Sequence, residues 1–161
     1  MARVAIAFGS NVGDRERYIH DAVDRLSSFI TALRLSRLFE TEPVDMAGEQ
    51  RQVVNAAATG ETELAARPLL ERMLAIEQEL WRTRPHPGAA RTLDLDLILY
   101  DDLILDEPPT LIVPHPRFRE RRFVLEPLAD VAPDWTDPVT GLTIARLLKN
   151  LADVERGYRS E

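Results

Sequence analysis

The chain has 161 residues and a mass of 18.2 kDa, with 45% hydrophobic and 29% charged residues. These values predict a single globular domain over residues 1–161, and no apolar run approaches the roughly 20 residues of a membrane span. A net charge of −7 argues against nucleic acid as a partner, because such binding needs a basic surface. The chain contains no cysteine and its first segment lacks a signal peptide's apolar core, so we expect a cytoplasmic protein without disulfides or thiolate metal sites.

Hydrophobic periodicity predicts the elements of an α+β layered domain. In chain order they are a strand over 3–8, a helix over 15–30, a strand over 33–39, a strand over 52–59, a helix over 68–82, a strand over 92–100, a short strand near 103–105, a helix near 119–125 and a last helix over 143–152. Gly9 to Asp14 is expected to be a structural turn between the first strand and helix. Residues 41–51 and 85–90 are predicted loops, and loops often carry function.

The strand from Thr92 to Tyr100 has two chemically opposite faces. Leucines at every second position from 93 to 99 predict a core face, and Asp94 and Asp96 project from the other face ~6.5 to 7 Å apart. Two neighbouring carboxylates repel each other unless a cation lies between them, and magnesium prefers such oxygen ligands together with phosphate oxygens. The alternative interpretation is a polar strand face turned to solvent.

Arginine is the predicted phosphate-binding residue of this chain. Arg82, Arg84 and Arg91 flank the Pro/Gly-rich loop, and phosphoryl transfer requires such neutralising charge. A Walker-type loop is excluded, because the only lysine, Lys149, lies in the last predicted helix. Since arginine carries almost every positive charge of the chain, its clustering can also be a compositional habit.

Three further side chains have an open assignment. His115, between two prolines, could contact a phosphate, although a lone loop histidine is more often merely exposed. Trp81 and Phe123 are expected by default in the hydrophobic core.

Six motifs carry a family resemblance: Gly9-Ser10-Asn11-Val12-Gly13-Asp14, Thr41-Glu42-Pro43-Val44, Asn55-Ala56-Ala57, Arg82-Thr83-Arg84, Arg91-Thr92-Leu93-Asp94-Leu95-Asp96 and the run from Val113 to Phe123. In order and spacing they resemble the signatures of 6-hydroxymethyl-7,8-dihydropterin pyrophosphokinase, a folate-pathway enzyme, from Val4 to about Pro133. The resemblance implies an antiparallel sheet flanked by helices, related to the ferredoxin-like arrangement. It also implies transfer of the β,γ-pyrophosphoryl unit of ATP to the pterin's hydroxymethyl oxygen, with two magnesium ions and AMP as the second product.

The same resemblance implies site residues. Asp94 and Asp96 would hold both metals, and Arg82 and Arg91 would complete the catalytic set by stabilising charge on the phosphates. The residues implied at ATP are Glu77, Arg82, Arg84, Arg91, Leu97, Leu111, Ile112, His115 and Arg121. Those implied at the pterin are Thr41, Glu42 through its backbone, Val44, Asn55, Asp94 and Phe123.

Asn55 would read the heteroatoms of the pterin ring and Phe123 would stack on its plane, while Asp94 would orient the attacking hydroxyl. Three places depart from the family pattern: Val53 replaces an aromatic residue, Trp81 replaces glycine, and Ala89-Ala90 replace Gly-Pro. We expect an active enzyme that works as a monomer. The alternatives are a non-catalytic nucleotide- or pterin-binding relative, and an RNA-binding module on a similar sheet.

Overall fold

The computed structural model of the chain describes residues 1–10, 15–41, 53–83, 93–107 and 111–159. Its elements are β1 (Ala2–Ser10), α1 (Arg15–Leu26), β2 (Thr31–Leu35), β3 (Phe39–Thr41), β4 (Val53–Thr62), α2 (Ala66–Thr83), β5 (Asp94–Tyr100), β6 (Leu105–Glu107), β7 (Leu111–Val113), the 3₁₀ turn η1 (Phe118–Glu120), α3 (Arg122–Val131) and α4 (Ile144–Arg159). None of the described helices is both long and apolar enough to cross a membrane.

The main sheet is antiparallel and has the strand order β2-β4-β1-β5, with β3 paired to the same strand, β4, that pairs with β2. Helix α1 connects β1 to β2 and helix α2 connects β4 to β5, which is the β-α-β-β-α-β order of ferredoxin-like folds. A separate two-stranded sheet pairs β6 with β7. The predicted antiparallel sheet flanked by helices is therefore confirmed.

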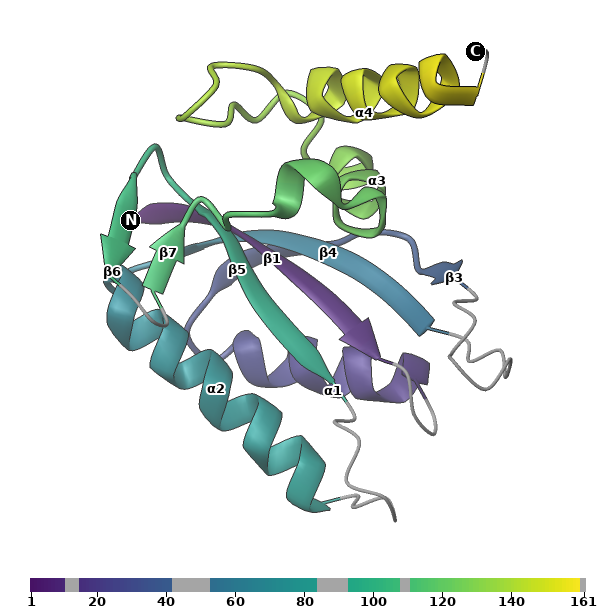
Figure 1. The fold of residues 1–161 in the computed structure, drawn as a ribbon. Helices are drawn as coiled ribbons and strands as arrows, with labels where there is room; N and C mark the ends of the chain where they lie inside the picture. Colours follow the sequence, from purple (N-terminus) through teal and green to yellow (C-terminus); the bar gives the residue numbers. More distant parts are fainter. Residues whose placement is uncertain (11–14, 42–52, 84–92, 108–110, 160–161) are drawn as a thin grey trace.

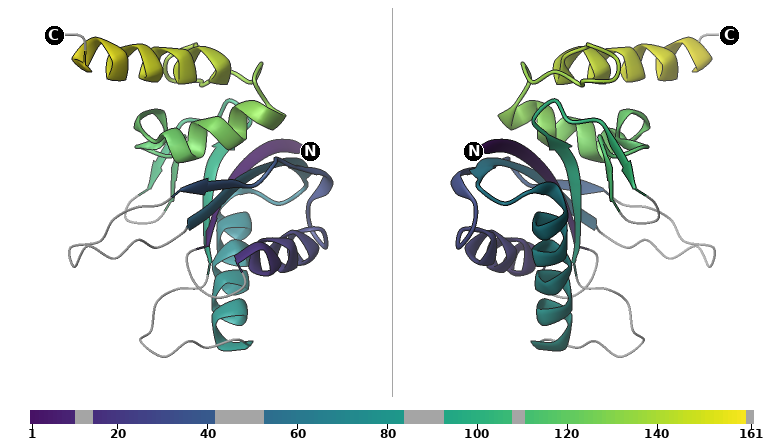
Figure 2. Two further views of the ribbon diagram at one scale, coloured as in Figure 1. Left: turned by 90° about the vertical axis from the view of Figure 1, so that its right-hand side faces the viewer. Right: turned by 90° about the vertical axis from the view of Figure 1, so that its left-hand side faces the viewer.

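Helices cover both faces of the sheet, so the molecule is layered (Figures 1 and 2). Helices α1 and α2 pack on one face, where alternate residues of the strands, among them Ile6, Ala56 and Leu95, build the larger core. Helix α3 lies on the other face and α4 packs on α3, over a second core that includes Ala5 and Ala57. Residues along each strand alternate between the two cores, because successive side chains of a strand point to opposite faces of the sheet.

A bulge interrupts the alternation along β5. Ala5 pairs with Leu99 while its neighbour Ile6 pairs with Leu97, so Ile98 is an extra residue on β5. Leu97 belongs to the core under α1 and α2, whereas Leu99 belongs to the core under α3. The prediction that Leu99 shares a face with the preceding leucines is therefore wrong. The carbonyl of Ile98 accepts a hydrogen bond from the backbone N–H of His115 at 3.0 Å.

Other differences concern boundaries and exposure. Gly9 lies inside β1 rather than in a turn, and the strand expected over residues 33–39 is split into β2 and β3. The helix expected near 119–125 is η1 followed by α3, and β7 was not predicted. Trp81 and Phe123 are 37% and 44% exposed, so neither is a core residue.

Candidate active site

Asp94 and Asp96 stand at the end of the sheet where β1 ends and β5 begins. Across β1, Asp94 pairs with Gly9 and Asp96 pairs with Ala7. Asp94 is exposed and Asp96 is half-buried, while Leu95 between them is buried on the opposite face. The two carboxylates therefore project together from the α3 side of the sheet, as the sequence pattern predicts.

A first cavity, of about 410 Å³, lies between α2, β5 and β7. It is lined by Leu70, Leu74, Glu77, Asp94, Leu95, Asp96, Leu97, Leu111, Ile112, Val113, His115 and Pro116. Five of the side chains predicted at ATP are in this set, namely Glu77, Leu97, Leu111, Ile112 and His115. The cavity combines an apolar wall with one imidazole, that of His115, and three carboxylates, those of Glu77, Asp94 and Asp96.

Glu77 connects the helix of this cavity to the strand that carries the aspartates. Its Oε2 accepts a hydrogen bond from the backbone N–H of Leu95 at 2.6 Å. This bond lies between Asp94 and Asp96 in the sequence, so it fixes the start of β5 against α2. Glu77 therefore helps to position the carboxylate pair in addition to lining the cavity.

A second cavity, of about 430 Å³, lies on the α3 side of the sheet. It is lined by Ala7, Phe8, Gly9, Ser10, Val53, Asn55, Asp94, Asp96, Arg121, Phe123 and Val124. Asn55 and Phe123, both predicted at the pterin, are among them. Asp94 and Asp96 line both cavities, and thus stand at the boundary between two adjacent binding spaces.

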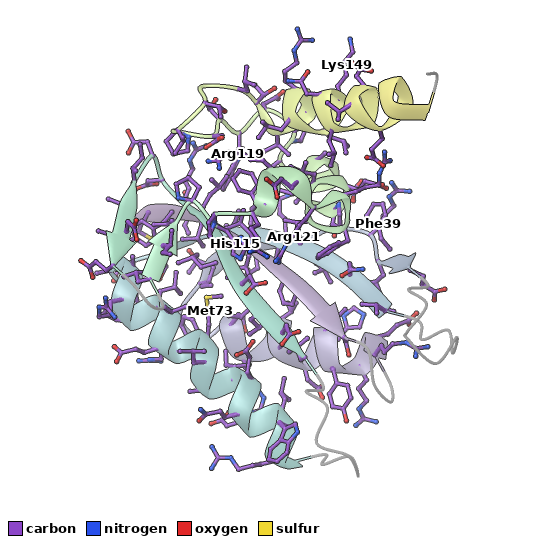
Figure 3. All side chains as sticks on the ribbon, viewed as in Figure 1. Phe39, Met73, His115, Arg119, Arg121 and Lys149 are labelled. Atoms are coloured by element: carbon purple, nitrogen blue, oxygen red, sulfur yellow. The ribbon has the colours of Figure 1, made fainter. Side chains whose placement is uncertain are left out.

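His115 lies on the loop after β7, close to Asp96 and Arg121. Figure 3 shows His115 and Arg121 near each other above the sheet. Burial lowers the pKa of His115 below its ordinary value, the neighbouring arginine charges lower it further, and the Asp96 carboxylate opposes them. Its Nδ1 accepts the backbone N–H of Arg117 at 3.2 Å, so the neutral ring carries its proton on Nε2. His115 is thus prepared to donate one hydrogen bond from Nε2.

The segment from Phe118 to Phe123 presents Arg121 and Phe123 to the second cavity. The backbone carbonyl of Arg121 accepts the N–H groups of Val124 and Leu125 at 3.0 Å each, which begins α3. The guanidinium of Arg121 lies 5.7 Å from the ring centre of Phe123, within cation–π range. The half-exposed face of Phe123 is consequently available beside a positive charge.

A buried ion pair holds the same segment to the loop that precedes α4. Arg119 donates from Nε and Nη2 to the two oxygens of Asp137, at 2.5 and 2.9 Å. Asp137 is completely buried and also accepts the Thr140 hydroxyl at 2.7 Å and the Val139 N–H at 3.1 Å. Every charge in the pair is therefore matched by hydrogen bonds, and η1 is fixed on this side of the molecule.

The remaining predicted site residues lie away from the expected cavity or outside the described part of the chain. Arg82 is exposed near the end of α2, where its Nε donates to the Gln78 carbonyl of the same helix at 3.3 Å. Thr41 is the last residue of β3, and the structure does not describe its side chain. Glu42, Val44, Arg84 and Arg91 lie outside the described residues. Arg121, predicted at ATP, lines the second cavity. Lys149 projects from α4, on the far side of α3 from the sheet (Figure 3).

The apolar walls of the two cavities were not among the predicted site residues. Leu70 and Leu74 line the first cavity with Glu77, and their spacing of four and three residues along α2 was an available signal for one shared helix side. Ala7 and Gly9 line the second cavity, where small residues alternating along β1 leave room above the strand. Among the described residues no group of three or more His, Asp or Glu side chains is arranged to hold a metal ion.

Comparison with known proteins identifies a consistent set of relatives. The sequence model of the family 7,8-dihydro-6-hydroxymethylpterin-pyrophosphokinase (HPPK) matches residues 5–133. The chain is 44% identical over 162 residues to the 2-amino-4-hydroxy-6-hydroxymethyldihydropteridine pyrophosphokinase of Bacillus subtilis, covering 97% of this chain and 96% of that protein. It is 40% identical over 138 residues to the Pseudomonas aeruginosa protein of the same name, covering 84% of each.

Other relatives are much longer than this chain. The folic acid synthesis protein fol1 of Pneumocystis carinii is 38% identical over 151 residues, but the match covers 93% of this chain and 20% of that protein. The fold is similar to the crystal structure of wild-type Plasmodium falciparum HPPK-DHPS, with a TM-score of 0.72 and 13% identity, covering 98% of this chain and 46% of that one. This chain thus corresponds to one part of these longer proteins.

Proposed function

Because the chain belongs to the 7,8-dihydro-6-hydroxymethylpterin-pyrophosphokinase family, an enzyme family of folate biosynthesis, we propose that its two adjacent cavities hold the two substrates of that reaction. ATP occupies the cavity between α2 and β7, and 6-hydroxymethyl-7,8-dihydropterin occupies the cavity beside Asn55 and Phe123. The observation that carries this proposal is that Asp94 and Asp96 line both cavities. A reaction between two bound molecules needs such a shared boundary.

The carboxylate pair suits a divalent cation. Asp94 and Asp96 offer hard oxygen donors on one sheet face, and phosphate oxygens and water can complete the coordination that magnesium prefers. We propose two magnesium ions, as the family resemblance implies. When bound, they neutralise charge on the phosphates and polarise the phosphorus that is attacked.

The chain's own residues orient the reacting groups. The hydroxymethyl oxygen attacks the β-phosphorus of ATP, the bond from that phosphorus to the oxygen bridging it to the α-phosphorus breaks, and AMP leaves with the bridging oxygen. The Asp94 carboxylate accepts a hydrogen bond from the attacking hydroxyl and takes up its proton as the new bond forms. Nε2–H of the neutral His115 donates to a phosphate oxygen. Arg82, Arg84 and Arg91 add positive charge at the phosphates.

The second cavity matches a flat polar heterocycle. Phe123 offers a ring face for stacking, and Asn55, which is 4% exposed, offers a carboxamide that can both donate and accept. Arg121 lines the second cavity, with its guanidinium over the ring of Phe123 and its charge near His115 of the first cavity. It can therefore reach the phosphates that are transferred to the pterin. We also propose that residues 1–161 act as one domain and as a monomer.

The test is the identity of the adenine product. The protein is incubated with ATP, magnesium and 6-hydroxymethyl-7,8-dihydropterin, and the products are separated and weighed by mass spectrometry. We expect AMP and the pterin diphosphate in equal amounts. ADP with a pterin monophosphate would mean ordinary kinase chemistry, and binding of both substrates without any product would mean a non-catalytic relative.

A further inference from the structure

Gly9 is the middle residue of a row of three paired residues, one from each of three neighbouring strands. The two outer residues are Asn55 and Asp94, which we propose to face the pterin. Gly9 pairs with Asn55 of β4 on one side and with Asp94 of β5 on the other. Residues that pair directly across antiparallel strands point to the same face, so the side chains of Asn55 and Asp94 flank Gly9 on the α3 side. With strands about 4.8 Å apart, the two flanking Cα atoms are about 10 Å apart. Gly9 itself places no side chain between them.

Neither the backbone nor the packing requires glycine here. Among the described residues, the glycine with a positive φ is Gly141, so Gly9 has an ordinary strand conformation. A Cβ atom on Gly9 would meet Oδ1 of Asn55 at 3.5 Å, which is normal van der Waals contact. At Gly60, by contrast, a Cβ would lie 2.4 Å from Cγ2 of Ile30. Packing therefore explains Gly60 but does not explain Gly9.

Glycine inside a strand also has an energetic cost. It loses more backbone entropy on folding than alanine and packs no side chain against its neighbours. Two residues earlier on the same face of β1, alanine takes the corresponding position. Ala7 pairs with Ala57 and Asp96 in the same arrangement and carries a methyl group. A strand that accepts alanine at position 7 has the geometry to accept it at position 9.

We infer that Gly9 is a specificity-determining residue, which keeps the floor of the pterin cavity open between Asn55 and Asp94. A ring read by Asn55 at one end and carrying its hydroxymethyl group toward Asp94 at the other must cross the backbone of Gly9. A methyl group at this position projects into that path and lifts the ring away from both partners. The inference rests on the proposed placement of the pterin and assigns to Gly9 a role in substrate selection that the strand itself does not need.

The experiment compares Gly9→Ala with the wild-type enzyme in three measurements: melting temperature without substrates, nucleotide affinity and KM for the pterin. We expect an unchanged or higher melting temperature, because alanine is the better strand residue. We expect nucleotide affinity to be unchanged, because Gly9 does not line the first cavity. The KM for the pterin should rise about tenfold to a hundredfold, the range that overpacking corresponds to.

Ala5→Gly is the matched control. Ala5 lies on the same face of β1 but is buried under the α3 core and lines neither cavity. This variant should lower the melting temperature and leave the KM for the pterin unchanged, which is the reverse of the Gly9→Ala pattern. Gly9→Val, with a larger side chain, should raise the KM further than Gly9→Ala.

Two outcomes overturn the inference. One is a folded Gly9→Ala enzyme whose KM for the pterin equals the wild-type value, and the other is a Gly9→Ala chain that does not fold, since the glycine would then serve the strand. If the wild-type protein itself forms no pterin diphosphate, the proposed function fails instead, and the two failures are distinguishable.

Discussion

Asp94 and Asp96, the pair that we propose to hold the metal, are unusual residues for a strand. Aspartate is depleted in strands, and two like charges on one face repel each other when no cation is bound. We therefore predict that Asp96→Ala reduces the rate of pterin diphosphate formation by more than about a hundredfold. Replacing a residue that only hydrogen-bonds to a metal ligand already lowers metal affinity or activity about 10 to 100-fold. The melting temperature without metal should stay the same or rise.

Asp106→Ala, an exposed aspartate of β6, is the control and should change neither quantity. A large drop in the metal-free melting temperature of Asp96→Ala would contradict the prediction, because the carboxylate would then be part of the fold's stability.

Phe123 is the exposed aromatic of the second cavity, and its replacement should separate the two substrates. We predict that Phe123→Ala weakens pterin binding about tenfold or more, since stacking on an aromatic ring is worth roughly 1 to 3 kcal/mol. Nucleotide affinity should be unchanged, because Phe123 is absent from the lining of the first cavity. Fluorescence titration with the pterin and calorimetry with an ATP analogue measure the two affinities.

Phe123→Tyr keeps the ring and should bind the pterin almost as well as the wild type. An equal loss of nucleotide and pterin affinity in Phe123→Ala would mean that the residue supports the site as a whole and does not stack on one substrate.

At the scale of single residues, the sequence was most informative where chemistry and periodicity agree. Two aspartates alternating with leucines can be assigned to one sheet face without a structure. Gly9 could not be assigned in this way, because glycine is typical of turns and only the pairing with Asn55 and Asp94 shows that it lies inside a sheet. The default core assignments of Trp81 and Phe123 failed, since local sequence does not show which aromatic residues the core leaves outside.

At the scale of elements, the Arg119–Asp137 pair anchors η1 and the segment that presents Arg121 and Phe123. Burial tends to raise the pKa of Asp137, but the hydrogen bonds from Arg119, Thr140 and the Val139 N–H, together with the Arg119 charge, lower it below its ordinary value. A lowered folded-state pKa contributes stability above the unfolded pKa and loses it as the pH falls through the folded value.

We predict that Asp137→Asn lowers the free energy of unfolding by about 2 to 3 kcal/mol near neutral pH, because it leaves a half-buried guanidinium without its charged partner. The difference from the wild type should shrink below about pH 4, where the unfolded aspartate is protonated. Urea unfolding at several pH values measures this difference.

The exposed neighbour Asp134 provides the control, because Asp134→Asn should unfold like the wild type at every pH. A stability difference between Asp137→Asn and the wild type that persists unchanged into acid would show that the ion pair does not supply it.

Hydrophobic periodicity predicts the helices of this chain better than it predicts the limits and bulges of its strands. The apolar stripes of α1, α2 and α4 appear directly in the sequence, because a helix buries residues at fixed local spacing. The bulge at Ile98 depends on the partner strand, and β7 forms through its pairing with β6, so neither is determined by local spacing. The displacement of Leu99 to the other core follows from that bulge.

At the scale of the whole molecule, the sheet separates two cores and brings distant segments together at one end. The end of β1 and the starts of β4 and β5 meet there, and they supply Gly9, Asn55 and Asp94 from positions far apart in the sequence (Figure 1). Helix α2 lines the first cavity, and the segment before α3 lines the second. The layered fold thus creates two adjacent cavities that share Asp94 and Asp96, and we propose that they hold the two substrates.

The most direct test of this arrangement is a crystal structure of the protein with magnesium, a non-hydrolysable ATP analogue and the pterin. We predict the nucleotide between α2 and β7, the pterin over Gly9 between Asn55 and Phe123, and magnesium held by Asp94 and Asp96 at the junction of the two ligands. A structure in which both ligands are bound while these two carboxylates face bulk solvent, with no cation between them and the phosphates, would contradict the account.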